Sequence, residues 1–239
     1  MKNLRAYTIV DFLKKRKEKY CSVDEMVRHF GVSPATMYRD IAELAAHDVI
    51  QKVRGGVALR TNAPAPVPVN SPFVERVNRD RKLKEAIAAQ AIALVEENDI
   101  LFLDSSTTVY FLARVLARSA FSSLTVITNS VTVMQEFPRF PAHYVRIGLG
   151  GSYDPQLNSF LGQATLRELG AREIGKAFVS AFGFGGGQAT TNHEHHAALL
   201  HEVLGLAGRK WLLVDHGKAA RSGLFPIAPL DAFDAVLTD

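Results

Sequence analysis

Six short apolar runs, separated by stretches with helical character, constrain the fold of this chain more than any other feature. The runs are Ile100–Leu103, Leu124–Thr128, Tyr144–Ile147, Ala177–Ser180, Trp211–Val214 and Ala235–Leu237. An amphipathic helix is predicted over Leu83–Glu97, and most runs are separated by helical patterns such as Tyr110–Ala117 and Ala198–Ala207. Strands that alternate with helices form an open, largely parallel sheet with helices on both faces. We therefore predict an α/β fold for this part of the chain.

A proline-rich segment, Thr61–Pro72, separates the strands and helices from the first sixty residues. It holds four prolines and no charged residue, a composition typical of an extended, semi-rigid linker. With 239 residues, the chain is long enough for one small and one medium domain. We predict a first domain over 1–60, a linker over 61–79 and a second domain over 80–239.

The first sixty residues carry the pattern of three short helices followed by a hairpin. The predicted elements are a helix over Leu4–Lys19, a second from Ser22 to Phe30, a third from Ser33, and strands over Val49–Val53 and Val57–Leu59. Ser22 and Glu25 have capping-box spacing, Gly31 ends the second helix, and Ser33-Pro34 begins the third. Two helices across a tight turn, followed by a hairpin, indicate a winged helix-turn-helix.

The outward face of the third helix and the tip of the hairpin are the predicted DNA-binding surfaces. Met37, Ile41 and Leu44 form a buried stripe, which directs the neighbouring polar side chains outward. The candidates are Ser33, Thr36, Tyr38 and Arg39 for base edges, and Lys52 and Arg54 for phosphate or minor-groove contacts. Residues 1–60 hold twelve Lys and Arg against seven Asp and Glu, whereas the rest holds sixteen against seventeen. This asymmetry favours double-stranded DNA as partner over a helix-turn-helix used only for protein contacts.

Hydroxyls, glycines and a few charged groups follow the predicted strands. Because ligands of doubly wound sheets lie beyond the carboxyl ends of the strands, these residues predict a pocket for a phosphorylated or polyhydroxylated molecule. The alternative is that they only cap helices and form turns. The predicted effector-binding residues are Asp104, Ser105, Ser106, Thr107, Thr108, Thr128, Asn129, Ser130, Gly150, Gly151, Asp215 and Lys218.

Other chemistries find weaker support in the sequence. His193, Glu194, His195 and His196 offer metal-binding side chains, although neighbouring residues on one segment rarely converge on one ion. The run Gly183–Gln188 lacks the spacing of a dinucleotide-binding loop, and no nucleophile elbow is present, so we expect no cofactor and no enzymatic activity. Cys21 is the only cysteine and no apolar run approaches membrane-spanning length, so we expect a cytoplasmic protein without membrane contact.

With these residues identified, the chain resembles the DeoR family of bacterial transcription regulators over nearly its whole length. The matching segments are Ser22–Glu25, Gly31–Ser33, Thr36–Ile41, Arg54–Gly56, Leu103–Ser105, Thr107-Thr108, Thr128–Ser130, Gly150-Gly151, Lys176–Phe178 and Asp215–Lys218. The resemblance implies that residues 1–60 form the DNA-binding domain and that residues 80–239 form an effector-sensing and oligomerisation domain similar to sugar-phosphate isomerases. It also implies a homo-oligomer, a dimer or tetramer, that represses a carbohydrate-utilisation operon and leaves operator DNA when a phosphorylated sugar binds.

The chain departs from the family pattern at three places. Tyr38 stands where the family often has the first of two arginines, and Ser106 stands where it often has glycine. Asn192–His196 replaces a segment in which the family tends to carry acidic residues, followed by a lysine near Leu199 and Leu200. We therefore expect a different base preference and a different contact with the effector. Two alternatives stay open: a sugar-phosphate-isomerase-like enzyme, and a metal-sensing regulator that uses His193–His196.

Overall fold

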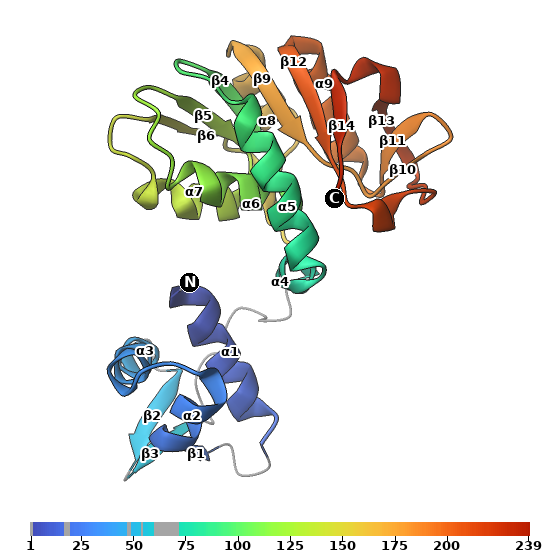
Figure 1. Cartoon of the computed structure of the whole chain (residues 1–239). Coiled ribbons are helices and arrows are strands. Elements are labelled where there is room, and N and C mark those ends of the chain that lie inside the picture. The colour runs from blue at the N-terminus through green and yellow to red at the C-terminus, as the bar shows by residue number, and fades with distance from the viewer. Residues whose placement is uncertain (1, 17–19, 47–48, 54, 60–71) are drawn as a thin grey trace. The chain divides into compact units, whose positions relative to one another are not determined.

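The computed structural model describes residues 2–16, 20–46, 49–53, 55–59 and 72–239 (Figure 1). The chain divides into two compact units, a head unit (Met1–Asn70) and a body unit (Ser71–Asp239). Most of the predicted linker lies outside the described residues, and its last part, from Pro72, begins a helix of the body unit.

The head unit is a three-helix domain with a small antiparallel sheet. Its elements are α1 (Lys2–Lys14), β1 (Tyr20–Ser22), α2 (Val23–Phe30), α3 (Pro34–Ala46), β2 (Ile50–Val53) and β3 (Gly56–Leu59), with sheet order β1-β3-β2. Ser22 caps α2 by accepting the N–H of Glu25, and Gly31 ends it in the left-handed conformation. Met37, Ile41 and Leu44 of α3 are buried in the core of the unit, as the sequence predicted. The unit is a winged helix-turn-helix, with an additional strand, β1, that the sequence did not predict.

The body unit is built on one six-stranded parallel sheet. Its strands are β4 (Ile100–Leu103), β5 (Thr125–Thr128), β6 (Val145–Gly148), β9 (Ile174–Val179), β12 (Ala207–Leu213) and β14 (Ala235–Leu237), in the order β14-β12-β9-β4-β5-β6. Each contains most or all of one predicted apolar run, so the prediction of a largely parallel α/β sheet is confirmed. The strands run outward from β4 to β6 on one side and from β9 to β14 on the other. Adjacent β4 and β9 therefore form the point at which the winding direction switches.

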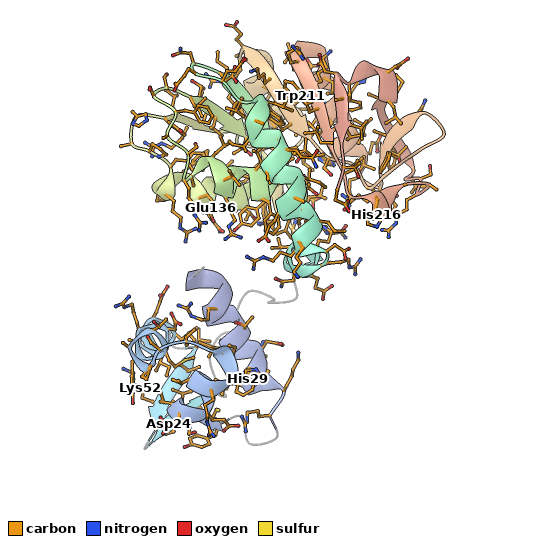
Figure 2. All side chains as sticks on the ribbon, in the orientation of Figure 1. Asp24, His29, Lys52, Glu136, Trp211 and His216 are labelled. Carbon is orange, nitrogen blue, oxygen red and sulfur yellow. The ribbon has the colours of Figure 1, made fainter. Side chains whose placement is uncertain are left out.

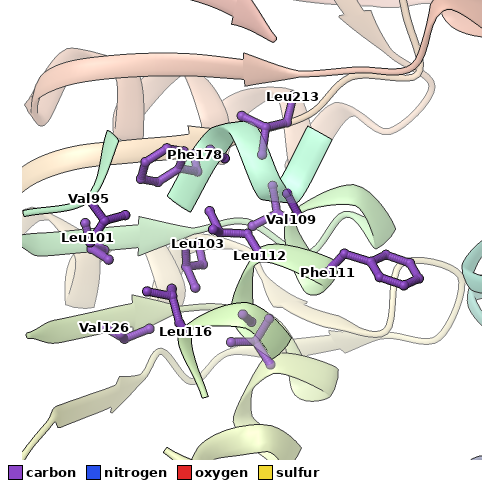
Figure 3. Close-up of a cluster of buried hydrophobic side chains, with 14 of the residues drawn as sticks. Val95, Leu101, Leu103, Val109, Phe111, Leu112, Leu116, Val126, Phe178 and Leu213 are labelled. Atoms are coloured by element: carbon purple, nitrogen blue, oxygen red, sulfur yellow. The ribbon is translucent and has the colours of Figure 1, made fainter. Parts of the chain in front are cut away.

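Helices cover both faces of this sheet. They are α4 (Pro72–Asn78), α5 (Arg81–Ala91), η1 (Ile92–Leu94), α6 (Thr107–Leu116), α7 (Val131–Glu136), η2 (Phe137–Arg139), α8 (Gln163–Gly170), α9 (Glu194–Leu206), η3 (His216–Lys218) and η4 (Leu230–Ala232). Successive side chains of a strand point to opposite faces. Leu101 and Leu103 therefore pack with α5 and α6, whereas Phe102 packs with α8 and α9. Figure 3 shows the first of these two cores, with Leu112 and Leu116 of α6 near the strands.

Two small antiparallel sheets were not predicted. They are the hairpin β7 (Ser152–Asp154) with β8 (Ser159–Leu161), and a three-stranded sheet of β10 (Gly183–Gly185), β11 (Gln188–Thr191) and β13 (Phe225–Pro229). The glycine-rich run that follows β9 thus supplies a short strand, β10, and a turn formed by Gly186 and Gly187, both at positive φ. This second sheet brings β11 and the segment before β13 close to the carboxyl end of β9.

Candidate functional site

The exposed face of α3 is the candidate DNA-binding surface of the head unit. Ala35, Tyr38, Arg39 and Ala42 are all exposed, and their spacing places them on one side of the helix. Tyr38 is 58% exposed. Because Ala35 and Ala42 are small, the side chains of Tyr38 and Arg39 are the two that protrude from this face. Sequence reasoning identified these two residues and missed the flanking alanines.

The start of α3 is fixed by its own hydroxyl groups. Ser33 Oγ accepts the N–H of Thr36 at 3.2 Å and lies 2.8 Å from Thr36 Oγ1. Ser33 is therefore the helix cap, and both hydroxyls remain near the protein surface. Lys52 of β2 is exposed on the wing (Figure 2). Arg54, the other predicted wing residue, lies outside the described residues.

A partly buried ion pair connects α3 to α1. Asp40, 1% exposed, follows Arg39 on α3 and accepts hydrogen bonds from the Arg5 guanidinium of α1. The second bond, from Arg5 Nη2 to Asp40 Oδ1, is 3.0 Å long. Because Asp40 is buried and the adjacent Arg39 is exposed, this bidentate contact with α1 orients the helix that presents Arg39.

A cavity of about 270 Å³ lies at the carboxyl end of the sheet in the body unit. Its wall includes Ser105–Thr107, which follow β4, and Ser180–Phe182, which follow β9. These are the two strands at which the winding direction of the sheet switches. In doubly wound sheets, ligands bind in the crevice at this switch point.

Asp104 does not line the cavity, but it holds two segments of the cavity wall together. It is fully buried, and its two carboxylate oxygens accept the N–H groups of Ser106 and Ser180, each at 2.8 Å. The carboxylate thereby ties the turn after β4 to the end of β9. Burial raises the pKa of Asp104 to about 6. Ser106 Oγ accepts the N–H of Val109, so Ser106 caps α6 and the start of that helix faces the cavity.

The cavity wall is rich in basic side chains. Five contribute, namely Arg76, Arg79, Lys84, Lys218 and Arg221, and two carboxylates, those of Asp80 and Asp215, accompany them. Lys218 Nζ donates to the backbone oxygen of Ala181 at 2.9 Å and to Ser180 Oγ at 3.2 Å. It lies 3.9 Å from an oxygen of Asp215. Such a wall favours an anionic ligand.

Two polar atoms in the cavity wall lack a partner. Ser105 Oγ and His196 Nε2 are buried and form no hydrogen bond with any residue that the structure describes. His196 is 5% exposed, and its Nδ1 lies 3.4 Å from Thr191 Oγ1. Burial lowers the pKa of His196 to about 4, so its ring is uncharged at neutral pH. Buried polar atoms without partners are rare, and here both line a cavity that a ligand with its own polar groups can fill.

The predicted effector residues divide into two groups. Ser105, Ser106, Thr107, Asp215 and Lys218 line the cavity together, and Asp104 supports it from below. The others lie outside the cavity wall, and the structure gives most of them internal hydrogen bonds. They are Thr108, Thr128, Asn129, Ser130, Gly150 and Gly151. Their role in effector binding stays a prediction.

The contacts of this second group belong to turns of the body unit. Thr128 Oγ1 donates to the backbone oxygen of Leu103 at 2.6 Å, and Asn129 Nδ2 donates to that of Phe160 at 3.1 Å. Ser130 caps α7. Gly151 has φ of +145°, and a Cβ there would lie 2.1 Å from Thr165 Oγ1, so only glycine fits this turn.

Several residues of the cavity wall were not predicted from the sequence. Arg76 and Arg79 precede β4, the first strand of the main sheet, in the sequence, and only tertiary packing brings them to the carboxyl end of that strand. Lys84 did carry a signal, because it shares the i, i+3, i+4, i+7 stripe of α5 with the buried Ile87, Ala88 and Ala91. A lysine on an apolar stripe is seldom buried without a partner.

The histidine segment forms part of the cavity wall through His193 and His196. Within the described part of the chain, no three His, Cys, Asp or Glu side chains are placed to hold a metal ion. None of the helices described here combines the length and apolar character of a membrane span.

Comparison with protein families gives two matches that together span most of the chain. The DeoR-like helix-turn-helix domain matches residues 5–63, and the DeoR C-terminal sensor domain matches residues 79–239.

Individual relatives match along nearly their whole length. The lactose phosphotransferase system repressor of Staphylococcus epidermidis is 31% identical, over 99% of this chain and 93% of the repressor. The glycerol-3-phosphate regulon repressor of Escherichia coli is 27% identical, over 97% of this chain and 88% of that protein. Among solved structures, the ribose 5-phosphate isomerase of Plasmodium falciparum shares 13% identity, with a TM-score of 0.42 over 60% of this chain and 55% of the isomerase.

Proposed function

The chain belongs to the DeoR family of transcription regulators, and from this we propose that it represses a carbohydrate-utilisation operon until a phosphorylated metabolite releases it from operator DNA. The relatives are repressors and carry a helix-turn-helix domain, so the chain is a DNA-binding regulator rather than an enzyme.

The cavity at the β4–β9 switch point is the observation that carries the effector proposal. It combines basic side chains, the start of α6 and two buried polar atoms that have no hydrogen-bond partner among the described residues. A phosphate placed near Ser105–Thr107 accepts hydrogen bonds from backbone N–H groups and hydroxyls, and it is attracted by Lys84 and Lys218. His196 and Asn192, which line the same cavity, are available to the remainder of the ligand.

The proposed regulation is a shift between two arrangements of the protein. An effector releases the DNA only if it binds the arrangement with low operator affinity more tightly than the other. We infer a cytoplasmic homo-oligomer, a dimer or tetramer. When one head of an oligomer binds its half-site, the effective concentration of the second head at the neighbouring half-site rises, so two linked heads bind more tightly than one.

A gel-shift titration of the full-length protein tests this function. At one fixed salt concentration, we expect tighter binding to the fragment upstream of its own operon than to random duplex of the same length. Phosphorylated sugars added to the complex are expected to release it, whereas the unphosphorylated sugars are not.

Arg39→Ala separates sequence recognition from general charge attraction. We expect a roughly tenfold to hundredfold loss of operator affinity, because a side chain that contacts a base contributes about 1–3 kcal/mol. Lys14→Ala, which removes an exposed positive charge from the end of α1, is the matched control and is expected to have a smaller effect. Equal affinity for the upstream fragment and random duplex, with and without phosphorylated sugars, would contradict the proposed function.

A further inference from the structure

Basic side chains predominate in the wall of the cavity. Five of them and two carboxylates line it, and the buried carboxylate of Asp104 lies close enough to act on the Lys218 ammonium. The distribution of the basic groups shows where a second anionic group of the ligand would lie.

The two lysines form the buried part of this charge. Lys84 is 4% exposed, and its Nζ donates to the backbone oxygens of Arg76 and Arg79. Lys218 bonds to Ser180 and Ala181 and lies near Asp215. Both lysines line the cavity together with Ser105, whose buried Oγ has no partner among the described residues. We call Lys84, Lys218 and Ser105 the inner group of the cavity wall and the place they line the inner subsite.

The three arginines form a second, more exposed group in the same wall. Arg76 is half-buried, and its Nη2 donates to the backbone oxygen of Gln156 at 2.9 Å. Arg79 and Arg221 are exposed, and neither forms an ion pair with any residue that the structure describes. The arginines come from α4, from the turn that follows it and from the loop before β13, three places that converge only in the folded body unit.

We propose that the effector carries two anionic groups, a phosphate in the inner subsite and a second phosphate or a carboxylate against Arg79 and Arg221. The inference rests on the proposed function, and it narrows the ligand class from phosphorylated sugars to those with a second negative group. Guanidinium groups bind phosphates and carboxylates through paired N–H donors, so both kinds of second group suit the arginine subsite.

Two matched pairs of compounds test the proposal on the full-length protein. Fructose 1,6-bisphosphate is compared with fructose 6-phosphate, and 6-phosphogluconate with glucose 6-phosphate, by thermal shift and calorimetric titration at constant ionic strength. In at least one pair, we expect the doubly anionic compound to bind about tenfold more tightly, as expected for one added charge-assisted contact. The pair that shows the difference identifies the second group as phosphate or carboxylate.

The double variant Arg79→Gln, Arg221→Gln assigns the preference to the arginine subsite. Both side chains lack ion pairs within the described part of the chain, so the variant is expected to fold, which circular dichroism checks. It should bind both members of a pair within about twofold of each other, because the charge-assisted contacts to the second group are lost. As a control, Arg167→Gln removes one positive charge from the exposed side of α8, away from the cavity wall, and should keep the preference.

The outcomes that overturn the proposal are distinct from failure of the proposed function. Equal binding within both pairs, or a preference that survives in the double variant, overturns the arginine subsite. Absence of binding by all four compounds overturns it as well. The operator titration decides separately whether the protein is a phosphate-released repressor, and release by a monophosphate as readily as by its doubly anionic partner leaves that function intact.

Discussion

Lys84 shows how one residue couples the chemistry of the cavity to pH. Burial lowers the pKa of its ammonium group to about 8, and the nearby Lys218 ammonium acts in the same direction. Burial also lowers the pKa of Lys218, while Asp215, Asp104 and Asp80 oppose these shifts. In the protein without ligand, Lys84 is therefore mostly charged below pH 8 and mostly neutral above pH 8. A bound anion favours the charged form, so ligand affinity depends on this titration.

We therefore expect the affinity for fructose 6-phosphate to fall roughly tenfold between pH 7 and pH 9, since the ligand itself stays a dianion over this range. Calorimetric titration at the two pH values measures the change. Lys84→Met should bind more weakly at pH 7 and lose much of the pH dependence. An affinity that stays constant in the unaltered protein would show that Lys84 does not contact the anion.

Substitution of Ser105 by alanine is expected to weaken ligand binding without lowering the stability of the ligand-free protein. Its buried Oγ has no partner in the described structure, so Ser105→Ala removes an unsatisfied polar atom. We expect the free energy of unfolding of the ligand-free protein to stay within about 0.5 kcal/mol of its original value, or to rise. The thermal shift produced by a phosphorylated ligand should become smaller. A loss of stability without ligand, together with a full thermal shift, would place the hydroxyl in the core rather than in the ligand site.

At the scale of elements, the small sheet β10-β11-β13 positions Arg221. Gly183 of β10 lies so close to the segment before β13 that a Cβ would come within 2.2 Å of the Arg221 backbone oxygen. Similarly, a Cβ on Gly223 would come within 2.5 Å of the Thr191 backbone oxygen. These close approaches hold the loop that carries Arg221 against the strands beside the cavity.

Gly183→Ala should therefore displace Arg221 and weaken the binding of doubly anionic ligands. We expect a destabilisation of about 1–3 kcal/mol from the forced backbone shift, seen in urea unfolding, and a reduced preference for fructose 1,6-bisphosphate. Gly205→Ala is the control, because nothing lies within 4 Å of a Cβ at that position in α9. Unchanged ligand preference in a folded Gly183→Ala protein would contradict the role given to this loop.

The same scale explains how far the sequence predicts the structure. The six strands of the main sheet were predictable because runs such as Ile100–Leu103 are apolar and bounded by helical patterns. β1 and β7 have three residues each, too few to show a period. The cavity residues that follow β4 and β12 were predictable from topology, since the carboxyl ends of the strands share one edge of the sheet. Arg76, Arg79 and Arg221 were not, because only the packing of α4 and of a loop brings them there.

At the scale of the whole molecule, the cavity belongs entirely to one unit. All its wall residues lie between Arg76 and Arg221, within Ser71–Asp239, and so do both hydrophobic clusters of the main sheet. We predict that residues 71–239 fold alone and show the same thermal shift with a phosphorylated ligand as the full-length protein. Aggregation of this fragment, or a shift that requires the head unit, would show that ligand binding depends on both units.

The position of Lys84 beneath α4 has a consequence for how occupancy of the cavity is communicated. α4 is the first helix of the body unit, and the Lys84 ammonium donates to one carbonyl oxygen in its last turn, that of Arg76, and to one in the turn that follows, that of Arg79. An anionic ligand that accepts a hydrogen bond from the Lys84 ammonium competes with these two carbonyl oxygens for its N–H donors. Lys84 thus has two roles: its ammonium group anchors the first helix of the body unit, and the same group is available to the bound metabolite.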